Sequence, residues 1–160
     1  MIKPIALAVA LALAAPAAQA GQGGNVQGAA GLALAALAAE HDASLPAAQR
    51  QAVAALFDGG KVTFPKGQTI VVKVDKIVCR VSDVAINQRS CALTFGTRIV
   101  NLAGRRANEL DATLAAAGVP PDGAAGSSYE ALSALNCSLD PSEIAQNSGG
   151  GASCAFMPGP

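Results

Sequence analysis

TIVVKVDKIVCRV, residues 69–81, predicts the fold class of the chain. Apolar residues occupy alternate positions and the alternation restarts one residue late, in the sets Ile70, Val72, Val74 and Ile77, Cys79, Val81. A period of two is typical of a β-strand with one buried face. A β-bulge at Asp75 and Lys76 would keep both sets on that face, because one extra residue restores the phase. Two short strands joined by a bend are the alternative.

SCALTFGTRIVNL, residues 90–102, follows as a predicted hairpin. Gly96 and Thr97 form its turn, since a two-residue type II′ turn requires glycine first. The resulting register pairs Phe95 with Arg98, Leu93 with Val100 and Cys91 with Leu102. Cys91 then shares a face with the leucines, the face to which Cys79 points on the preceding strand.

Helices are predicted on both sides of these strands. One covers Leu32 to Glu40, a second follows with Ser44 as N-cap, and a third follows Gly104 and ends at Gly118. LSALNCSL, residues 132–139, alternates as a strand with Ser133, Leu135, Cys137 and Leu139 inward, although a helix over 129–135 is an alternative. Ala152, Cys154 and Phe156 mark a closing strand. We therefore predict an α+β fold: N-terminal helices, then a mainly antiparallel β-sheet with one packed helix.

The first twenty residues, MIKPIALAVALALAAPAAQA, have the three parts of a secretory signal peptide. Lys3 gives the charged start, residues 5–15 are apolar, and Ala18-Gln19-Ala20 is a small-x-small cleavage site. The apolar run is shorter than the ~20 residues that cross a bilayer, so we expect no membrane span. Position 21 is glycine, which offers no thiol for lipid attachment. The pattern predicts export to the periplasm or the medium.

After the predicted cleavage, residues 21–31 are glycine-rich and are expected to form a flexible leader. Residues 32–157 are expected to form a single domain, and residues 158–160 a loose tail. The core of this domain is predicted to be thin, because tryptophan is absent, aromatic residues make up 3 % of the chain and alanine is abundant. Burial contributes about 25 cal/mol per Å² of apolar surface, so small side chains contribute little each.

All four cysteines follow the predicted signal peptide: Cys79, Cys91, Cys137 and Cys154. An even number of cysteines in an exported chain indicates disulfides. Four cysteines allow three pairings, and the strand pattern favours Cys79 with Cys91 and Cys137 with Cys154. Their wide spacing fits neither a CxxC redox pair nor a structural zinc site.

No catalytic constellation is recognisable in the sequence. Nucleophilic catalysis needs a nearby base, and the single histidine, His41, lies in a polar connection between two predicted helices. Glu109 and Asp111, two positions apart on a helix, point to different faces. The glycine-rich stretches lack the lysine and the strand–helix context of a phosphate-binding loop. We expect a non-enzymatic protein without cofactor or metal.

Charge is segregated along the chain. Residues 61–106 carry nine basic and two acidic side chains, a net charge of +7, whereas residues 107–160 carry six acids and no lysine or arginine. Pairing of the two regions inside the domain is the first interpretation. The second is an anion- or partner-binding patch, whose candidate members are Arg89, Arg98, Arg105 and Arg106. The basic strands lack aromatic residues that stack on bases, so we expect no nucleic-acid partner.

These observations predict an exported binding module that presents a disulfide-stapled surface to a protein or to an anionic envelope component. Its first candidate surface is the loop from Ser82 to Ser90, including Asn87 and Arg89, because a cross-linked stem lowers the cost of ordering a loop. An ordinary hairpin connection is the alternative for this loop. The alternative function is a structural or accessory component of a bacterial cell-envelope assembly, in which the leader and the apolar first helix pack on a larger partner. The partner and the oligomeric state stay open.

Overall fold

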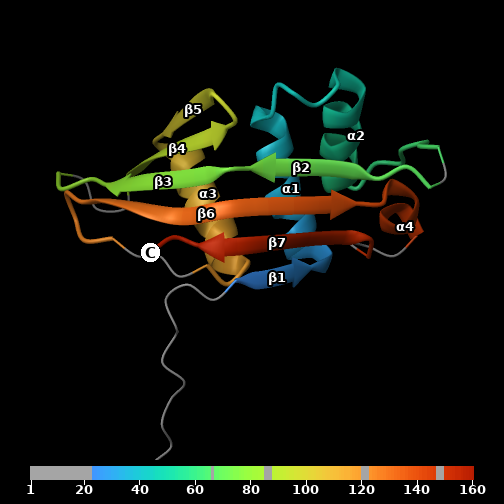
Figure 1. Cartoon of the computed structure of the whole chain (residues 1–160). Helices are drawn as coiled ribbons and strands as arrows, with labels where there is room; N and C mark the ends of the chain where they lie inside the picture. Colours follow the sequence, from blue (N-terminus) through green and yellow to red (C-terminus); the bar gives the residue numbers. More distant parts are fainter. Residues whose placement is uncertain (1–22, 66, 85–87, 120–122, 147–149) are drawn as a thin grey trace, which may run out of the picture.

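The computed structural model describes residues 23–65, 67–84, 88–119, 123–146 and 150–160 (Figure 1). The predicted signal peptide, residues 1–20, lies outside these ranges. The described chain confirms the predicted α+β fold, with seven strands and four helices: β1 Gly24–Gln27, α1 Gly28–His41, α2 Ala47–Phe57, β2 Ile70–Val74, β3 Lys76–Val81, β4 Arg89–Phe95, β5 Arg98–Ala103, α3 Arg105–Ala116, β6 Ser128–Leu139, α4 Pro141–Gln146 and β7 Ala152–Pro158.

All seven strands belong to one antiparallel sheet, in the order β1-β7-β6-β3-β4-β5. Strand β2 lies outside this path and pairs with β6. Because β6 is long, β2 pairs with its second half and β3 with its first half, so β2 and β3 lie end to end (Figure 1). The β4–β5 hairpin continues the sheet beyond β3 alone.

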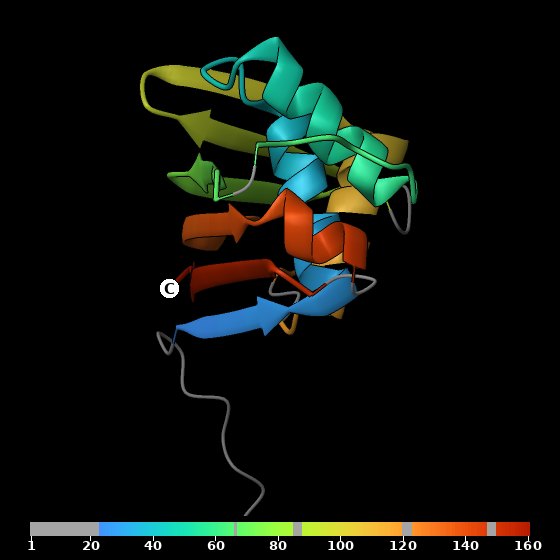
Figure 2. The ribbon, with the colours of Figure 1, turned by 90° about the vertical axis from the view of Figure 1, so that its right-hand side faces the viewer.

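The helices cover one face of the sheet. Figure 2 shows α1, α2 and α3 on the same side of the strands, while no described helix lies on the other side. Helix α4 lies beyond the end of β6. Every helix in the described part of the chain is too short or too polar to cross a membrane.

The core between sheet and helices follows the predicted alternation. Ile70, Val72, Val74, Ile77 and Cys79 are all at most 1 % exposed. Helix α1 contributes small buried residues, among them Ala35, Ala38 and Ala39, which bring its backbone close to the sheet. Gly31 is required for this approach, because a Cβ atom there would lie 2.9 Å from the Val26 carbonyl oxygen. A core poor in aromatic residues is thus filled by close backbone approach.

The alternative to the predicted bulge is the one that the structure shows: β2 ends at Val74, β3 begins at Lys76, and Asp75 forms a bend between these two short strands. The Asp75 N–H donates to the Thr94 carbonyl oxygen at 2.8 Å, and Lys76 also faces Thr94 in the β3–β4 register. Asp75 and Lys76 thus both lie opposite Thr94, and the apolar residues on either side of the bend keep facing the core. Strand β6 changes phase at the same level, since Val74 pairs with Leu135 and Ile77 with Leu132.

Because of this phase change in β6, the predicted inward position of Ser133 is wrong. Leu132 is buried and Ser133 is exposed, whereas the simple alternation placed Ser133 inward. The β6–β7 register shifts between Leu132 and Ala134, so Ser133 is the extra residue. The alternative of a helix over 129–135 is also excluded, because these residues lie within β6.

The hairpin and the end of α3 agree with prediction. Phe95 pairs with Arg98, and Gly96 has the positive φ of 61° that the turn requires. Gly118 has a φ of 89° after α3, and the Val119 N–H donates to the Leu114 carbonyl oxygen at 2.9 Å. This is the glycine-terminated helix end that the sequence indicated.

The glycine-rich stretch is not a flexible leader over its described part. Residues 24–27 form β1, which pairs with β7, and α1 already begins at Gly28. The absence of a side chain is what allows the pairing, because a Cβ on Gly24 would lie 2.4 Å from the Phe156 ring. At the other end, β7 includes Pro158 and the Gly159 N–H donates to the Ala131 carbonyl oxygen, so the expected tail is partly paired.

The connection between α1 and α2 also differs from prediction. Helix α2 begins after Pro46 without a side-chain cap, so Ser44 is not its N-cap. Ser44 instead donates its backbone N–H and its hydroxyl to Asp42 Oδ1, at 2.9 and 2.6 Å. His41, expected in this connection, is the last residue of α1.

Candidate binding surfaces

Both predicted disulfides are present, Cys79–Cys91 between β3 and β4 and Cys137–Cys154 between β6 and β7. Each joins residues directly opposite each other, and all four cysteines are at most 3 % exposed. The bridges face the helix layer, where Cys154 Sγ lies 3.3 Å from the Gly31 carbonyl oxygen. They are therefore placed to stiffen the sheet rather than to meet a redox partner.

Arg89 links three elements inside the domain. Its Nε lies 3.1 Å from Asp111 Oδ2 on α3, and its terminal NH1 donates to the Tyr129 hydroxyl on β6. The guanidinium also lies 5.9 Å from the centre of the Tyr129 ring. The side chains of Arg89 and Asp111 are only 18 % and 25 % exposed. This contact occupies a residue that the sequence analysis assigned to a partner-binding loop.

The other arginines of the predicted patch are distributed differently. Arg105 pairs with Glu109 one helical turn away at 3.5 Å, and Arg106 pairs with Glu40 of α1. Arg98, at the start of β5, has no carboxylate within ion-pair distance among the described residues. Asn87 lies outside the described residues. A role of these residues in partner binding stays a prediction.

Among the described residues, pairing with acids of the region 107–160 accounts for three of the nine basic residues in the segment 61–106. The contacts Lys76–Glu130, Arg89–Asp111 and Arg105–Glu109 each join the basic region 61–106 to an acid of 107–160. The first interpretation of the charge pattern is thus confirmed for these three pairs. Cations without such a partner are then the better indicators of a binding surface.

His41 has a titration shifted by its surroundings. Partial burial lowers its pKa from 6.5, Glu40 acts in the opposite direction, and the positive charges of Arg106 and Arg98 lower the pKa further. No hydrogen bond joins His41 to a hydroxyl or thiol in the described part of the chain. The pair of groups that nucleophilic catalysis requires is not assembled around it there.

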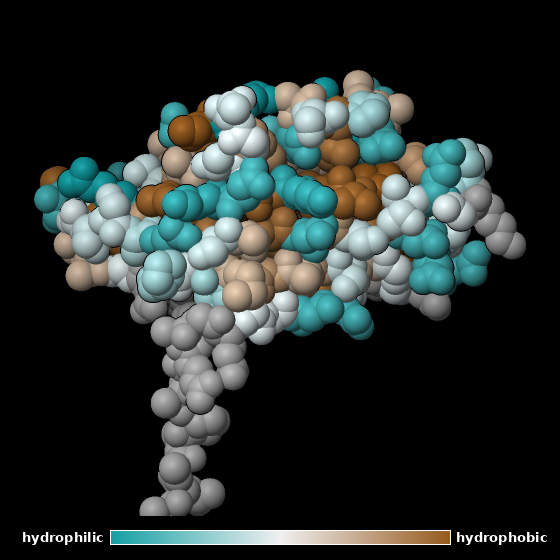
Figure 3. Space-filling view, in the orientation of Figure 1, coloured by the Kyte–Doolittle hydropathy of each residue, from teal (hydrophilic) through white to brown (hydrophobic). Residues whose placement is uncertain are grey.

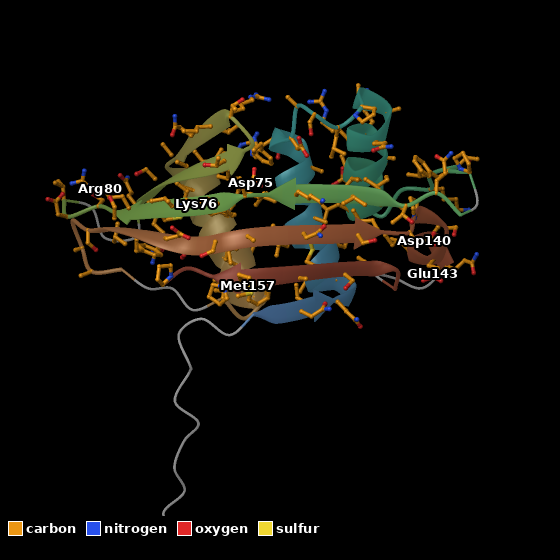
Figure 4. All side chains as sticks on the ribbon, viewed as in Figure 1. Asp75, Lys76, Arg80, Asp140, Glu143 and Met157 are labelled. Carbon is orange, nitrogen blue, oxygen red and sulfur yellow. A yellow bond between two sulfur atoms is a disulfide. The ribbon has the colours of Figure 1, made fainter. Side chains whose placement is uncertain are left out.

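The uncovered face of the sheet carries a mixture of hydrophilic and hydrophobic residues (Figure 3). Its outward positions alternate with the buried ones, and include Ala134, Asn136 and Ser138 on β6 and Ala155 on β7. Val71, Ile99 and Met157 add apolar surface, being 44 %, 60 % and 45 % exposed. Figure 4 labels Asp75, Lys76 and Arg80 along the β2–β3 line and Met157 on β7.

A notch interrupts the sheet beside β2, where the β4–β5 hairpin does not reach. It has a volume of about 480 Å³. Its walls are the α1–α2 connection at 42–44, the outward residues Val71 and Lys73 of β2, and the hairpin tip at Phe95, Gly96 and Arg98. Figure 3 shows hydrophobic residues gathered over β2 next to this notch. Arg98 was a predicted site residue, whereas Val71 and Lys73 were not.

A second concavity lies on the helix side, between α1, α2 and α3. It has a volume of about 860 Å³ and is lined by alanines, Leu37 and Phe57 together with polar and charged residues such as Glu40 and Glu109. Phe57 is 53 % exposed. Arg50 also lines this groove, and its Nε is buried without a hydrogen-bond partner among the described residues. No motif in the sequence marked this groove.

Metal-binding clusters and known relatives give no further assignment. Among the residues that the structure describes, His, Cys, Asp and Glu side chains form no group of three that could hold a metal ion. The chain matches no protein-family model, no curated protein and no solved structure.

Proposed function

We propose that this chain is an exported, non-enzymatic binding module whose uncovered sheet face contacts a protein partner. The observation that carries the proposal is the one-sided architecture: the helices cover one face of a seven-stranded sheet and leave the other to solvent. A broad sheet face with exposed Val71, Ile99 and Met157 offers apolar contact area that a partner would remove from water.

Two further features support the proposal. Disulfides persist in oxidising compartments, which agrees with the signal-peptide pattern of residues 1–20. Because each bridge ties neighbouring strands, the face is held in one shape before binding, which lowers the entropy lost on association. Small outward side chains lose little rotamer freedom when they are covered.

The surface proposed here is not the loop from Ser82 to Ser90. Arg89, the basic residue of that loop, is engaged with Asp111 and Tyr129, and Asn87 lies outside the described residues. The sheet face replaces the loop because its exposed apolar residues come from several strands of one uncovered sheet.

The test places the same bulky charge on opposite layers of the molecule. Ala134 is exposed on β6 in the uncovered face, and Ala115 is exposed on α3 in the helix layer. Wild type, Ala134→Arg and Ala115→Arg are used for affinity capture from the native envelope and culture fluid, with quantitative mass spectrometry. We expect proteins captured by wild type and Ala115→Arg to be lost with Ala134→Arg. Equal capture by all three chains contradicts the proposal.

The alternative, a component of a cell-envelope assembly, needs a different surface from the one first considered. Helix α1 packs on the chain's own sheet, with Leu34 and Ala35 fully buried, so it is not free to pack on a larger partner. The groove beside Phe57 favours this alternative instead. Loss of a stoichiometric complex with Phe57→Ser, but not with Ala134→Arg, would support assembly through the helix side.

A further inference from the structure

The edge of β2 inside the notch is open. Strand β2 pairs with β6 on one side, and no described strand pairs with its other side. Strand β3, in line with β2, has its corresponding edge covered by β4. An added strand beside β2 would therefore continue the line of β4 past its end at Phe95 (Figure 1).

The Cys137–Cys154 disulfide shows to which side each residue of β2 points its backbone N–H and C=O groups, because Cys137 lies on β6, the strand that pairs with β2. The Cα atoms of Cys137 and Cys154 are 4.0 Å apart, which identifies a non-hydrogen-bonded pair of an antiparallel ladder. The backbone groups of Cys137 thus point away from β7 and toward its partner on β2, Val72. Since successive residues of a strand point their backbone groups to opposite sides, those of Val71 and Lys73 point to the open edge.

A second hydrogen bond agrees with this phase. Asp75, two residues beyond Lys73, donates its N–H to the Thr94 carbonyl oxygen of β4 at 2.8 Å. The open edge of β2 therefore lies on the same side as β4, which pairs with β3 from Lys76 onward. Val71 and Lys73 present two N–H and two C=O groups to the notch, and groups of this kind are the usual template for an added strand.

The side chains around the notch indicate which kind of segment fits. Its two acids keep their negative charge, but Asp42 is buried and accepts two hydrogen bonds from Ser44, and Asp75 accepts one from the Gly96 N–H. Lys73 and Arg98 are exposed and have no ion pair within the described ranges of the chain. The exposed charges of the notch are thus two cations without an ion pair and the one carboxylate of Asp75, a positive balance that favours carboxylate side chains on an incoming segment.

A second copy of β2 is a poorer occupant. In an antiparallel pair of two β2 strands centred on Val72, the two Lys73 side chains would be diagonal neighbours on one face, about 7–8 Å apart. Like charges at this distance repel. The open edge is also only five residues long and lies beside the hairpin tip, so it suits a short extended segment.

We propose that the open edge of β2 binds a short, extended, acidic segment of a partner protein. The segment adds to the sheet through the backbone groups of Val71 and Lys73 and places carboxylates near Lys73 and Arg98. This inference deepens the proposed function and rests on it, because it names how a partner of the uncovered face would be held.

The test uses the oxidised exported protein and two capped hexapeptides, Thr-Glu-Val-Glu-Val-Thr and Thr-Lys-Val-Lys-Val-Thr. Amide hydrogen exchange of β2 is followed by NMR. At saturating acidic peptide, we expect exchange of the Val71 and Lys73 amides to slow by about tenfold, with little change at Val72, whose amide points to β6. The basic peptide should bind more weakly.

Charge variants test the side-chain contribution. Lys73→Glu and Arg98→Glu should each weaken binding of the acidic peptide by about threefold to tenfold, as expected for exposed charge contacts. Arg80→Glu is the matched control, since Arg80 is an exposed cation at the far end of β3 (Figure 4). N-methylation of the peptide at alternate positions should abolish protection, because it removes the donors of the added strand.

Three results would overturn the inference. The first is acidic-peptide binding that leaves the Val71 and Lys73 amides unprotected. The second is no binding by either peptide, and the third is protection that rises with protein concentration alone, which would identify a second copy as the occupant. Loss of partner capture by Ala134→Arg together with any of these would reject the edge mechanism and leave the proposed function in place.

Discussion

Arg89 illustrates how a charge that the sequence offers to a partner can be paired inside the domain. Its charge and its place after a polar loop predicted a partner contact, yet it points to the helix layer and joins Asp111 and Tyr129. The acids that pair with the basic strands come from a later part of the chain, so their positions depend on tertiary packing. A count of charges along the sequence cannot distinguish a paired arginine from an unpaired one.

The first prediction compares Arg89 with Arg105. Arg89→Met should lower the free energy of unfolding by about 1–2 kcal/mol, because a partly buried carboxylate and a tyrosine hydroxyl lose their partner. Arg105→Met should change it by less than about 0.5 kcal/mol, since the Arg105 side chain is 87 % exposed. Urea denaturation followed by circular dichroism measures both, and equal effects would contradict the assigned roles.

The second prediction concerns His41 and pH. Its pKa in the folded state is lowered below 6.5, first by burial and then by the charges of Arg106 and Arg98. Between the folded and unfolded pKa values the unfolded chain binds more protons, so stability falls as pH drops below about 6.5 and levels off below the folded pKa.

The variant His41→Gln provides the control for this pH dependence. It should remove the loss of stability between about pH 7.5 and pH 5.5, which urea midpoints at several pH values would measure. The acid limb at lower pH should remain in the variant, because Asp140 and Glu130 have lowered pKa values that come mainly from serine hydroxyls. An unchanged profile near pH 6 would contradict the role of His41.

Strands whose own sequence alternates clearly between apolar and polar residues could be predicted. The inward and outward positions of a strand could not be predicted where they depend on how it pairs with a neighbouring strand. The break between β2 and β3 at Asp75 is visible in the sequence because apolar residues at alternate positions flank it on both sides. In β6, Leu132 and Leu135 also break the alternation, but Ser133 between them fits a simple strand equally well. Only the pairing with β7 fixes Ser133 as the outward residue.

The strand β1 in the glycine-rich segment could not be predicted either, because it also depends on pairing with a distant strand. Gly24 has low strand propensity, so composition favoured a flexible leader. Its pairing with Phe156 depends on a residue at the opposite end of the chain. The helix starting at Gly28 was predicted only from Leu32 onward for the same reason, since glycine and alanine carry little periodic signal.

The third prediction concerns the disulfides as braces between strands. Replacing Cys79 and Cys91 together by alanine, or Cys137 and Cys154 together, should lower the free energy of unfolding by about 3 kcal/mol in each case, because the closed loops have similar length. Urea denaturation of the oxidised variants measures this. A loss well under 1 kcal/mol for either pair would show that the packed sheet does not depend on that bridge.

The notch could not be foreseen because it is a property of the whole sheet. Both β2 and β3 pair with β6, and the β4–β5 hairpin follows only β3, which leaves the edge of β2 uncovered. Arg98 was identified from charge alone. Val71 and Lys73 became candidates only when the strand order and the backbone phase were known.

The fourth prediction concerns the N-terminal segment as part of the fold. Deletion of residues 21–43 should prevent folding rather than release a partner, because it removes β1 and the fully buried Leu34 and Ala35 of α1. Circular dichroism should show loss of the cooperative thermal transition. A deleted chain with a native-like transition would restore the view that this segment is a detachable leader.

The pairing of the first strand with the last has a consequence for how the chain matures. Val26 pairs with Cys154, so β1 and the face of α1 that packs on β7 cannot form their contacts until nearly the whole chain has been synthesised. Such long-range pairing makes folding slow and late. In a chain that emerges N-terminus first, β1 would therefore stay unpaired until β7 has emerged, and the Cys137–Cys154 bridge can close only at that late stage.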